Sequence, residues 1–408
     1  MIRSIYARLK SKLNVLWASV LGGALAASGT LSAQTFDRPQ LSPFPKLPPI
    51  TSIPAAEKPS AMDNNTIFDP MVQQASGGGG CCGKTNYNNG LFGYVHGGCG
   101  SGNGCYAGRT PCHGFDADTW CGRLLGCLYE ELCCPDPCYE PAWIPTANAA
   151  FFQDGPRPVT QTRVRWDRGH NYRFPDTAEF FWAQIGGKGP ATPTPSLRYD
   201  QLWFYQEIAA KGASVFVELT YLTHDPVFGN SAAGMGDMNV GAKTVLLDRE
   251  LLLITMQFRT FIPTGNFTAG LGTGHVALEP SLMAALKLTH STHLQTQISE
   301  WIPLGGSNGF QGSVFHFHGS LNHMLCEYGN MLAIIGTLEL NGYTFRGQFT
   351  DFPSGEPASL SAATYMNGGP GLRVQICERV DFGFAAAFGF GNRHGPDQLY
   401  RSEFRLRY

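Results

Sequence analysis

Charged residues are scarce in this sequence. Asp, Glu, Lys and Arg make up 15% of its 408 residues, and the formal net charge is −2. No stretch gathers Lys and Arg into a basic surface, so we expect no nucleic-acid partner. Beyond residue 33 there is also no apolar run of the ~18 residues that a membrane-spanning helix needs. Spanning β-strands remain possible, because their alternating pattern gives a mean hydropathy like that of a soluble protein.

The first 33 residues have the pattern of a signal peptide. Basic residues without acidic ones open the chain, the apolar stretch Leu13–Leu25 follows, and small residues end at Ala33. A transmembrane helix is the alternative, but this stretch is too short for one. We therefore expect cleavage after Ala33 and export of residues 34–408.

Three segments of different composition follow the signal peptide. Residues 34–75 are rich in Pro and predict an extended, disordered linker. Residues 76–140 hold ten of the twelve cysteines among many glycines, and residues 141–161 are a connector with several prolines. In an oxidising compartment the cysteines predict a small disulfide-bonded periplasmic unit, with metal binding as the alternative. The disulfide candidates are Cys81, Cys82, Cys99, Cys105, Cys112, Cys121, Cys127, Cys133, Cys134 and Cys138.

The stretch Gln398–Tyr408 alternates strictly. Tyr400, Phe404 and Tyr408 fall on one face, with charged residues on the other, so the period is that of a strand. A last strand that ends on an aromatic residue resembles that of a bacterial outer-membrane barrel, which the barrel assembly machinery reads. The alternative on this stretch alone is the last strand of a soluble β-sandwich.

Alternation continues through residues 162–408. The predicted strands are Thr162–Tyr172, Leu197–Ala210, Ala213–His224, Asp237–Leu247, Leu251–Ile262, His275–Leu288, Thr292–Ile302, Ser313–Leu325, Met331–Thr344, Gly371–Cys377, Val380–Gly391 and Leu399–Tyr408. The connections between them are alternately long and short. The long ones are Arg173–Ser196, Asp225–Gly236, Pro263–Gly274, Pro303–Gly312, Phe345–Pro370 and Asn392–Gln398. Short periplasmic turns and long outer loops predict an all-β fold, a transmembrane antiparallel up-and-down β-barrel of about 12 strands.

The two faces of these strands differ in chemistry. In Val380–Gly391 four phenylalanines share one face, and other strands oppose Leu, Ile and Met to charged residues. One face suits lipid, whereas the charged face suits a wet lumen better than a dry core. A soluble barrel with paired interior charges is the alternative. The expected lumen-lining residues are Arg163, Arg165, Glu207, Glu218, Lys243, Arg259, Glu279, Lys287, His316, His318, Glu339, Arg373, Glu403, Arg405 and Arg407.

The region Gly234–Gly305 resembles a known family. Gly236-Asp237 opens a predicted strand, and Pro263-Thr264-Gly265 ends one before a Gly-rich loop. These marks resemble the outer-membrane barrel family named after the meta-pathway of phenol degradation, and the Cys-rich segment before the barrel resembles a planctomycete-type version. The resemblance implies outer-membrane transport of small or hydrophobic molecules, and it supplies no substrate-binding residues.

Three features carry weaker chemical signals. His316, His318, Ser320 and Asn322 share one strand face, which would suit metal chelation or hydrolysis, although lining of a polar lumen explains them as well. Gly270–Gly274 resembles a nucleotide-binding loop only superficially, because no βαβ unit surrounds it. Cys326 and Cys377 fall at different short turns, so we expect two free or locally shielded thiols.

The sequence as a whole predicts an outer-membrane channel for passive transport of small solutes, hydrophobic ones included. No enzymatic activity, metal or cofactor is expected, and the expected partners are outer-membrane lipid, the assembly machinery and the solute. The alternative is an occluded barrel that anchors the Cys-rich unit. We further expect that unit or the linker to plug the periplasmic mouth, so that deleting Ser76–Cys138 would raise conductance.

Overall fold

The structure is a computed structural model that describes residues 119–133, 139, 141–329, 331–377 and 379–408. The predicted signal peptide, the linker and most of the Cys-rich unit lie outside the described residues. One helix, α3 (Trp120–Cys133), belongs to that unit, and the Thr119 hydroxyl caps its start by accepting a hydrogen bond from the Gly122 N–H at 3.0 Å. None of the described helices is long and apolar enough to cross a membrane.

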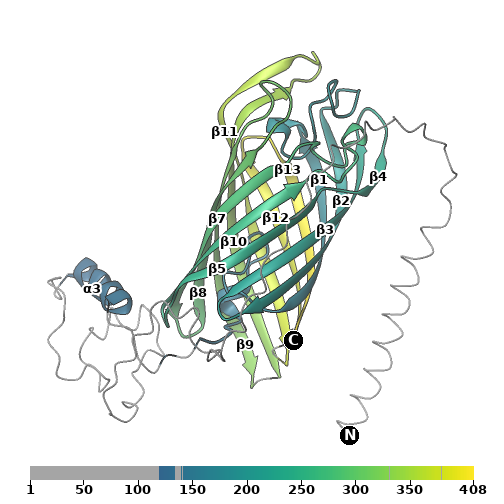
Figure 1. Ribbon diagram of the computed structural model, residues 1–408. Helices are drawn as coiled ribbons and strands as arrows, with labels where there is room; N and C mark the ends of the chain where they lie inside the picture. Colours follow the sequence, from purple (N-terminus) through teal and green to yellow (C-terminus); the bar gives the residue numbers. More distant parts are fainter. Residues whose placement is uncertain (1–118, 134–138, 140, 330, 378) are drawn as a thin grey trace, which may run out of the picture. The chain divides into compact units, whose positions relative to one another are not determined.

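The described part of the chain is dominated by antiparallel strands, most of which pair with their neighbours in sequence (Figure 1). Strand β1 also pairs with β13, from Gln161 opposite Arg407 to Tyr172 opposite Pro396, which closes the sheet into a barrel. The strands are β1 (Gln161–Arg173), β2 (Ser196–Ala210), β3 (Ala213–Pro226), β4 (Ala232–Met235), β5 (Met238–Asp248), β6 (Leu252–Ile262), β7 (Ala277–Thr289), β8 (Thr292–Pro303), β9 (Val314–Tyr328), β10 (Leu332–Thr350), β11 (Pro357–Ile376), β12 (Val380–Gly391) and β13 (Pro396–Arg407).

Strands β4 and β5 together occupy one position in the barrel. Both pair with β3, β4 opposite His224–Tyr221 and β5 opposite Glu218–Ala213. The barrel therefore has twelve positions, and the predicted antiparallel barrel of about 12 strands is confirmed. Each connection at one end of it is a short turn, and the longer connections lie at the other end.

The prediction of a long loop at residues 345–370 is wrong. Residues Phe345–Pro370 were expected to form a loop, but β10 runs to Thr350 and β11 begins at Pro357. Small polar residues there predict a loop, yet the two strands stay paired because Phe345 and Tyr365 are buried on their inner face. The hairpin therefore projects beyond the rest of the long-loop end (Figure 1). The connection expected at Asn392–Gln398 is likewise shorter, because β13 begins at Pro396.

Gly236-Asp237 lies between β4 and β5, so this pair interrupts a strand where the sequence predicted the start of one. The Asp237 carboxylate accepts hydrogen bonds from the Gly265 N–H at 3.0 Å, the Thr273 N–H at 2.8 Å and the Thr273 hydroxyl at 3.0 Å. A side chain at Gly272 would place its Cβ 2.3 Å from Asp237 Oδ1, so only glycine allows this approach. The Gly-Asp and Pro-Thr-Gly marks of the family resemblance thus contact one another.

Replacing Asp237 by Ala should loosen the connection between β6 and β7. The substitution leaves two backbone N–H groups and one hydroxyl without their acceptor, and we expect a loss of about 2–3 kcal/mol of local stability. Limited proteolysis of the folded protein should then cleave between residues 265 and 274. Asp225→Ala, which removes an exposed carboxylate bonded to Arg198, is the control. Equal cleavage of both variants would show that Asp237 does not hold this loop.

Candidate functional site

The outside of the barrel carries a belt of apolar side chains. Outward positions on nearly every strand hold large apolar residues, and Phe204, Phe258 and Phe384 are each more than 40% exposed. A continuous apolar surface of this extent is rare on a soluble monomer and is typical of a lipid-facing barrel wall. Other members of the belt are Leu202, Ile208, Val215, Leu219, Met256, Leu282, Ile298, Phe315, Leu321, Leu338, Leu340, Leu372, Phe382 and Phe388.

The inward positions carry the charges. Of the fifteen residues predicted to line the lumen, twelve are buried and three, Arg165, Arg259 and Lys287, are half-buried. Many of them form ion pairs across neighbouring strands, such as Arg373 Nη2 with Glu403 Oε1 at 2.9 Å and Lys243 Nζ with Glu207 Oε2 at 3.3 Å. The sequence list missed three inward charges that belong to the same networks, namely Asp167, Asp381 and Arg401. Alternation within β1, β12 and β13 would have included all three.

A chain segment fills the lumen near the short-turn end. Residues 144–155 precede β1 and include the 3-10 helix η2 (Thr146–Asn148), and those from Thr146 to Asp154 are buried. Thr146 bonds His293 near the turn between β7 and β8 at 2.7 Å, and Arg157 pairs with Asp248 near the turn between β5 and β6 at 2.7 Å. We call residues 144–155 the plug. The sequence indicated only a connector here.

Inward side chains from strands all around the barrel hold the backbone of the plug. Glu339 on β10 accepts hydrogen bonds from the N–H groups of Phe151 at 2.7 Å and Phe152 at 3.0 Å. Arginine side chains on other strands donate hydrogen bonds to carbonyl groups of the plug. Arg373 on β11 reaches Ala149 at 3.0 Å, and on β13 Arg401 reaches Phe151 at 2.5 Å and Arg405 reaches Ala150 at 3.0 Å. Apart from the turn at η2, where the Ala147 and Asn148 N–H groups bond Ile144 and Pro145, these side chains satisfy much of the polar backbone of the plug.

One carboxylate of the plug, that of Asp154, lies against the part of the barrel wall formed by β1 and β6. Asp154 accepts a hydrogen bond from Arg259 at 2.7 Å and one from Gln257 at 3.0 Å, and Arg163 lies 3.4 Å away. These cations hold the pKa of Asp154 well below its usual range, although burial alone would raise it. Asp154 therefore stays ionised, and it ties the plug to β1 and β6.

A second inward segment lies near the long-loop end. The connection from β1 to β2 contains the 3-10 helix η3 (Thr177–Glu179) and three aromatic residues, Phe180–Trp182. The Asp176 carboxylate accepts hydrogen bonds from the Thr350 hydroxyl at 2.5 Å and the Ile185 N–H at 3.2 Å. Burial raises the pKa of Asp176 against the opposing effect of these hydrogen bonds. The aromatic residues become part of the barrel interior, and Trp182 is 1% exposed.

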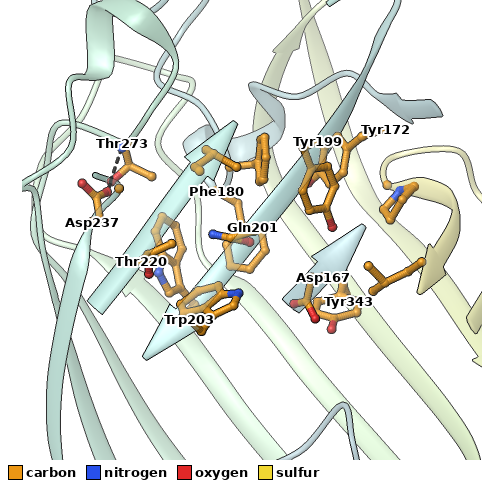
Figure 2. A pocket seen from close by; sticks show the side chains of 18 of the residues that line it. Asp167, Tyr172, Phe180, Tyr199, Gln201, Trp203, Thr220, Asp237, Thr273 and Tyr343 are labelled. Carbon is orange, nitrogen blue, oxygen red and sulfur yellow. Dashed lines mark hydrogen bonds between the residues drawn. The ribbon is translucent and has the colours of Figure 1, made fainter. Parts of the chain in front are cut away.

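Between this segment and the plug the lumen keeps a cavity of about 240 Å³. Arg401 borders both spaces, because it lines the cavity and bonds the plug. Figure 2 shows Gln201, Trp203, Asp167 and Tyr343 around the same space. Ten of its 25 lining residues are aromatic, namely Tyr172, Phe180, Phe181, Tyr199, Trp203, Phe261, Trp301, Tyr343, Phe345 and Tyr365.

His316 and His318 on β9 have separate partners. His316 Nδ1 lies 3.2 Å from Glu279 Oε1, and His318 Nδ1 lies 2.9 Å from Asn341 Oδ1. Phe180 packs edge-on against His316 with ring centroids 5.3 Å apart. Among the described residues no three His, Cys, Asp or Glu side chains gather as a metal site would require. Packing within the lumen accounts for both histidines.

Three cysteines are described with their side chains. Cys121, Cys326 and Cys377 carry free, exposed thiols. The two free thiols expected in the barrel are thus confirmed. The side chains of the other nine disulfide candidates lie outside the described residues, so the disulfide-bonded unit stays a prediction.

No protein-family model matches the chain, so the likeness to the meta-pathway barrels stays a resemblance. No curated protein matches it either. Among solved structures, it is similar to the COG4313 outer membrane channel from Pseudomonas putida F1, with 9% identity over 67% of this chain and 99% of that one, at a TM-score of 0.46. It is also similar to the NanC porin (6% identity, 60% and 98% covered, TM-score 0.37) and the KdgM porin (9% identity, 61% and 99% covered, TM-score 0.35). These are similarities of barrel form between chains that share few residues.

Proposed function

We propose that this protein is an outer-membrane channel for passive transport of small solutes, hydrophobic ones included, and that the plug closes it at rest. The observation that carries the proposal is the arrangement of the lumen. A cavity lies on the long-loop side, and the material that blocks the remaining path is a separate segment of chain, held by hydrogen bonds and ion pairs. The barrel wall alone encloses a lumen that is wide enough to hold a short segment of chain.

The apolar belt supports the membrane placement. In lipid every backbone polar group needs an internal partner, and a closed barrel provides one for each strand. By analogy with barrels of this kind the short turns face the periplasm, which places the plug at the periplasmic mouth and the cavity on the outer side. The N-terminal segments of the chain would then lie in the periplasm.

A second function is favoured by the density of contacts on the plug. If the plug never leaves, the barrel is a closed anchor that ties the N-terminal segments to the membrane. Both functions share the same fold and differ in whether the lumen opens. An enzyme is not proposed. The Ser299 hydroxyl and His316 both contact the Glu279 carboxylate, at 2.7 Å and 3.2 Å, but none of these three residues lines the cavity.

The purified mature chain, residues 34–408, tests the proposal in a planar bilayer. Insertion is first confirmed by heat-modifiable gel migration. We expect the inserted channels to stay closed most of the time and to open in brief, discrete steps. The frequency of these openings should rise when mild denaturant loosens the plug. Inserted protein that never opens under any of these conditions would favour the anchor. Protein that fails to insert would overturn both functions.

A further inference from the structure

The cavity carries polar groups that no protein partner satisfies. Trp203 Nε1 and Thr220 Oγ1 line it, and both are buried without a hydrogen-bond partner among the described residues. A buried polar group without a partner costs free energy. A bound molecule that supplies the missing partners would remove this cost, whereas a purely apolar one would leave it in place.

The rings around these groups are held in position by the fold. Phe181 stacks on Tyr172 with centroids 4.7 Å apart, and Tyr172 meets Tyr199 edge-on at 5.9 Å. The Arg165 guanidinium lies 4.4 Å from the centre of the Trp203 ring and holds it from one side. Flat, rigid aromatic walls with a few polar groups are typical of small-molecule sites. They suit a ligand that has a flat apolar face as well as polar substituents.

The charges of the lining do not favour an anion. Arg401 is the one cation among the described lining residues, and Asp167 engages it through two hydrogen bonds of 2.7 Å. Burial lowers the pKa of His394, in the connection between β12 and β13, to about 4, so this imidazole is neutral at pH 7. Asp237 also lines the cavity, so a carboxylate ligand would face a second acidic side chain besides Asp167, while Arg401 is already engaged.

The volume of the cavity limits the size of the ligand. Its 240 Å³ far exceeds the space one water needs but falls below the ~300 Å³ at which drug-sized pockets begin. We infer that this cavity binds a neutral, single-ring molecule with several hydroxyl groups, the chemistry of a pyranose sugar. The inference rests on the proposed channel, because the bound solute would be the one that the open lumen passes.

Isothermal titration of the full mature chain in detergent micelles tests the inference, with blank micelles subtracted. Methyl β-D-glucopyranoside is the main probe, glucuronate tests for anions, and benzyl alcohol provides a ring with one hydroxyl. We expect the glucoside to bind at least about tenfold more tightly than either of the others, since each hydroxyl pairing is a neutral hydrogen bond. Absent glucoside binding, or tighter binding of benzyl alcohol, would overturn the inference.

Two substitutions test whether the sugar binds in this cavity. Trp203→Phe keeps a ring and removes the indole donor, and Gln201→Leu removes an amide at nearly constant volume. Each should weaken glucoside binding about fivefold to tenfold. Trp166→Phe, on the outer face of β1 and 37% exposed, is the control and should bind as the wild type does. Unchanged binding by both cavity variants would place the sugar elsewhere. Binding at equilibrium needs no open channel, so conductance without sugar binding would contradict only this inference.

Discussion

A barrel that begins at residue 160 should conduct ions in long, steady steps. Without residues 34–159 the plug is gone and the lumen loses the segment that fills it. We expect mean conductance to exceed that of the mature chain by about tenfold or more, because an unfilled barrel of this size leaves a water-filled path. Planar-bilayer recording of the two chains, each with insertion confirmed, gives the comparison.

The matched control deletes residues 76–138 and keeps the plug. The sequence alone predicted that this deletion would open the channel. Because residues 144–155 fill the lumen, we now expect the conductance of this variant to equal that of the mature chain. If the shorter deletion alone opened the channel, the N-terminal segments and not the plug would close it.

A gentler variant separates loosening of the plug from its removal. Glu339 holds two N–H groups of the plug and is 3% exposed. In Glu339→Leu both groups lose their acceptor while the wall keeps its shape, so openings should become more frequent without a larger step size. A larger step size would mean that the barrel wall itself had changed.

The barrel could be predicted from the sequence because its signal is local. Alternation along each strand depends on which face a residue occupies, and the contrast between Phe384 outside and Arg373 inside is visible in the sequence itself. The error at Phe345–Pro370 has the same origin. Pairing of β10 with β11 through that region depends on cross-strand contacts such as that between Thr344 and Thr364, which no local pattern reports.

The plug could not be predicted in this way. Phe151 and Glu339 are 188 positions apart in sequence, and a segment without regular structure has no period to detect. One signal was nevertheless present. The stretch from Ala142 to Gln153 has no charged residue and includes Trp143 and two phenylalanines, which is unusual for an exposed connector. The excess of inward arginines was a second signal, because their partners include the carbonyl groups of the plug.

Replacing Glu403 by Gln should destabilise the barrel strongly. The Glu403 carboxylate is 1% exposed and lies among three guanidinium groups. It bonds Arg405 and Arg373, the latter at 2.9 Å, and Arg163 Nε lies 3.9 Å from it. An amide of the same size removes the negative charge and leaves these cations facing each other, so we expect a loss of about 3–5 kcal/mol.

Urea unfolding of the barrel in lipid vesicles, followed by the shift in gel migration, measures this loss. Glu300→Gln is the control, because Glu300 pairs at 3.6 Å with an Arg346 side chain that is 65% exposed, and such pairs contribute at most about 1 kcal/mol. Adding Arg405→Met to Glu403→Gln should recover part of the stability, since it removes one of the cations left without a partner. If Glu403→Gln were no worse than the control, water would screen the charges of the lumen wall, and the space beside the plug would be wetter than the burial of these side chains indicates.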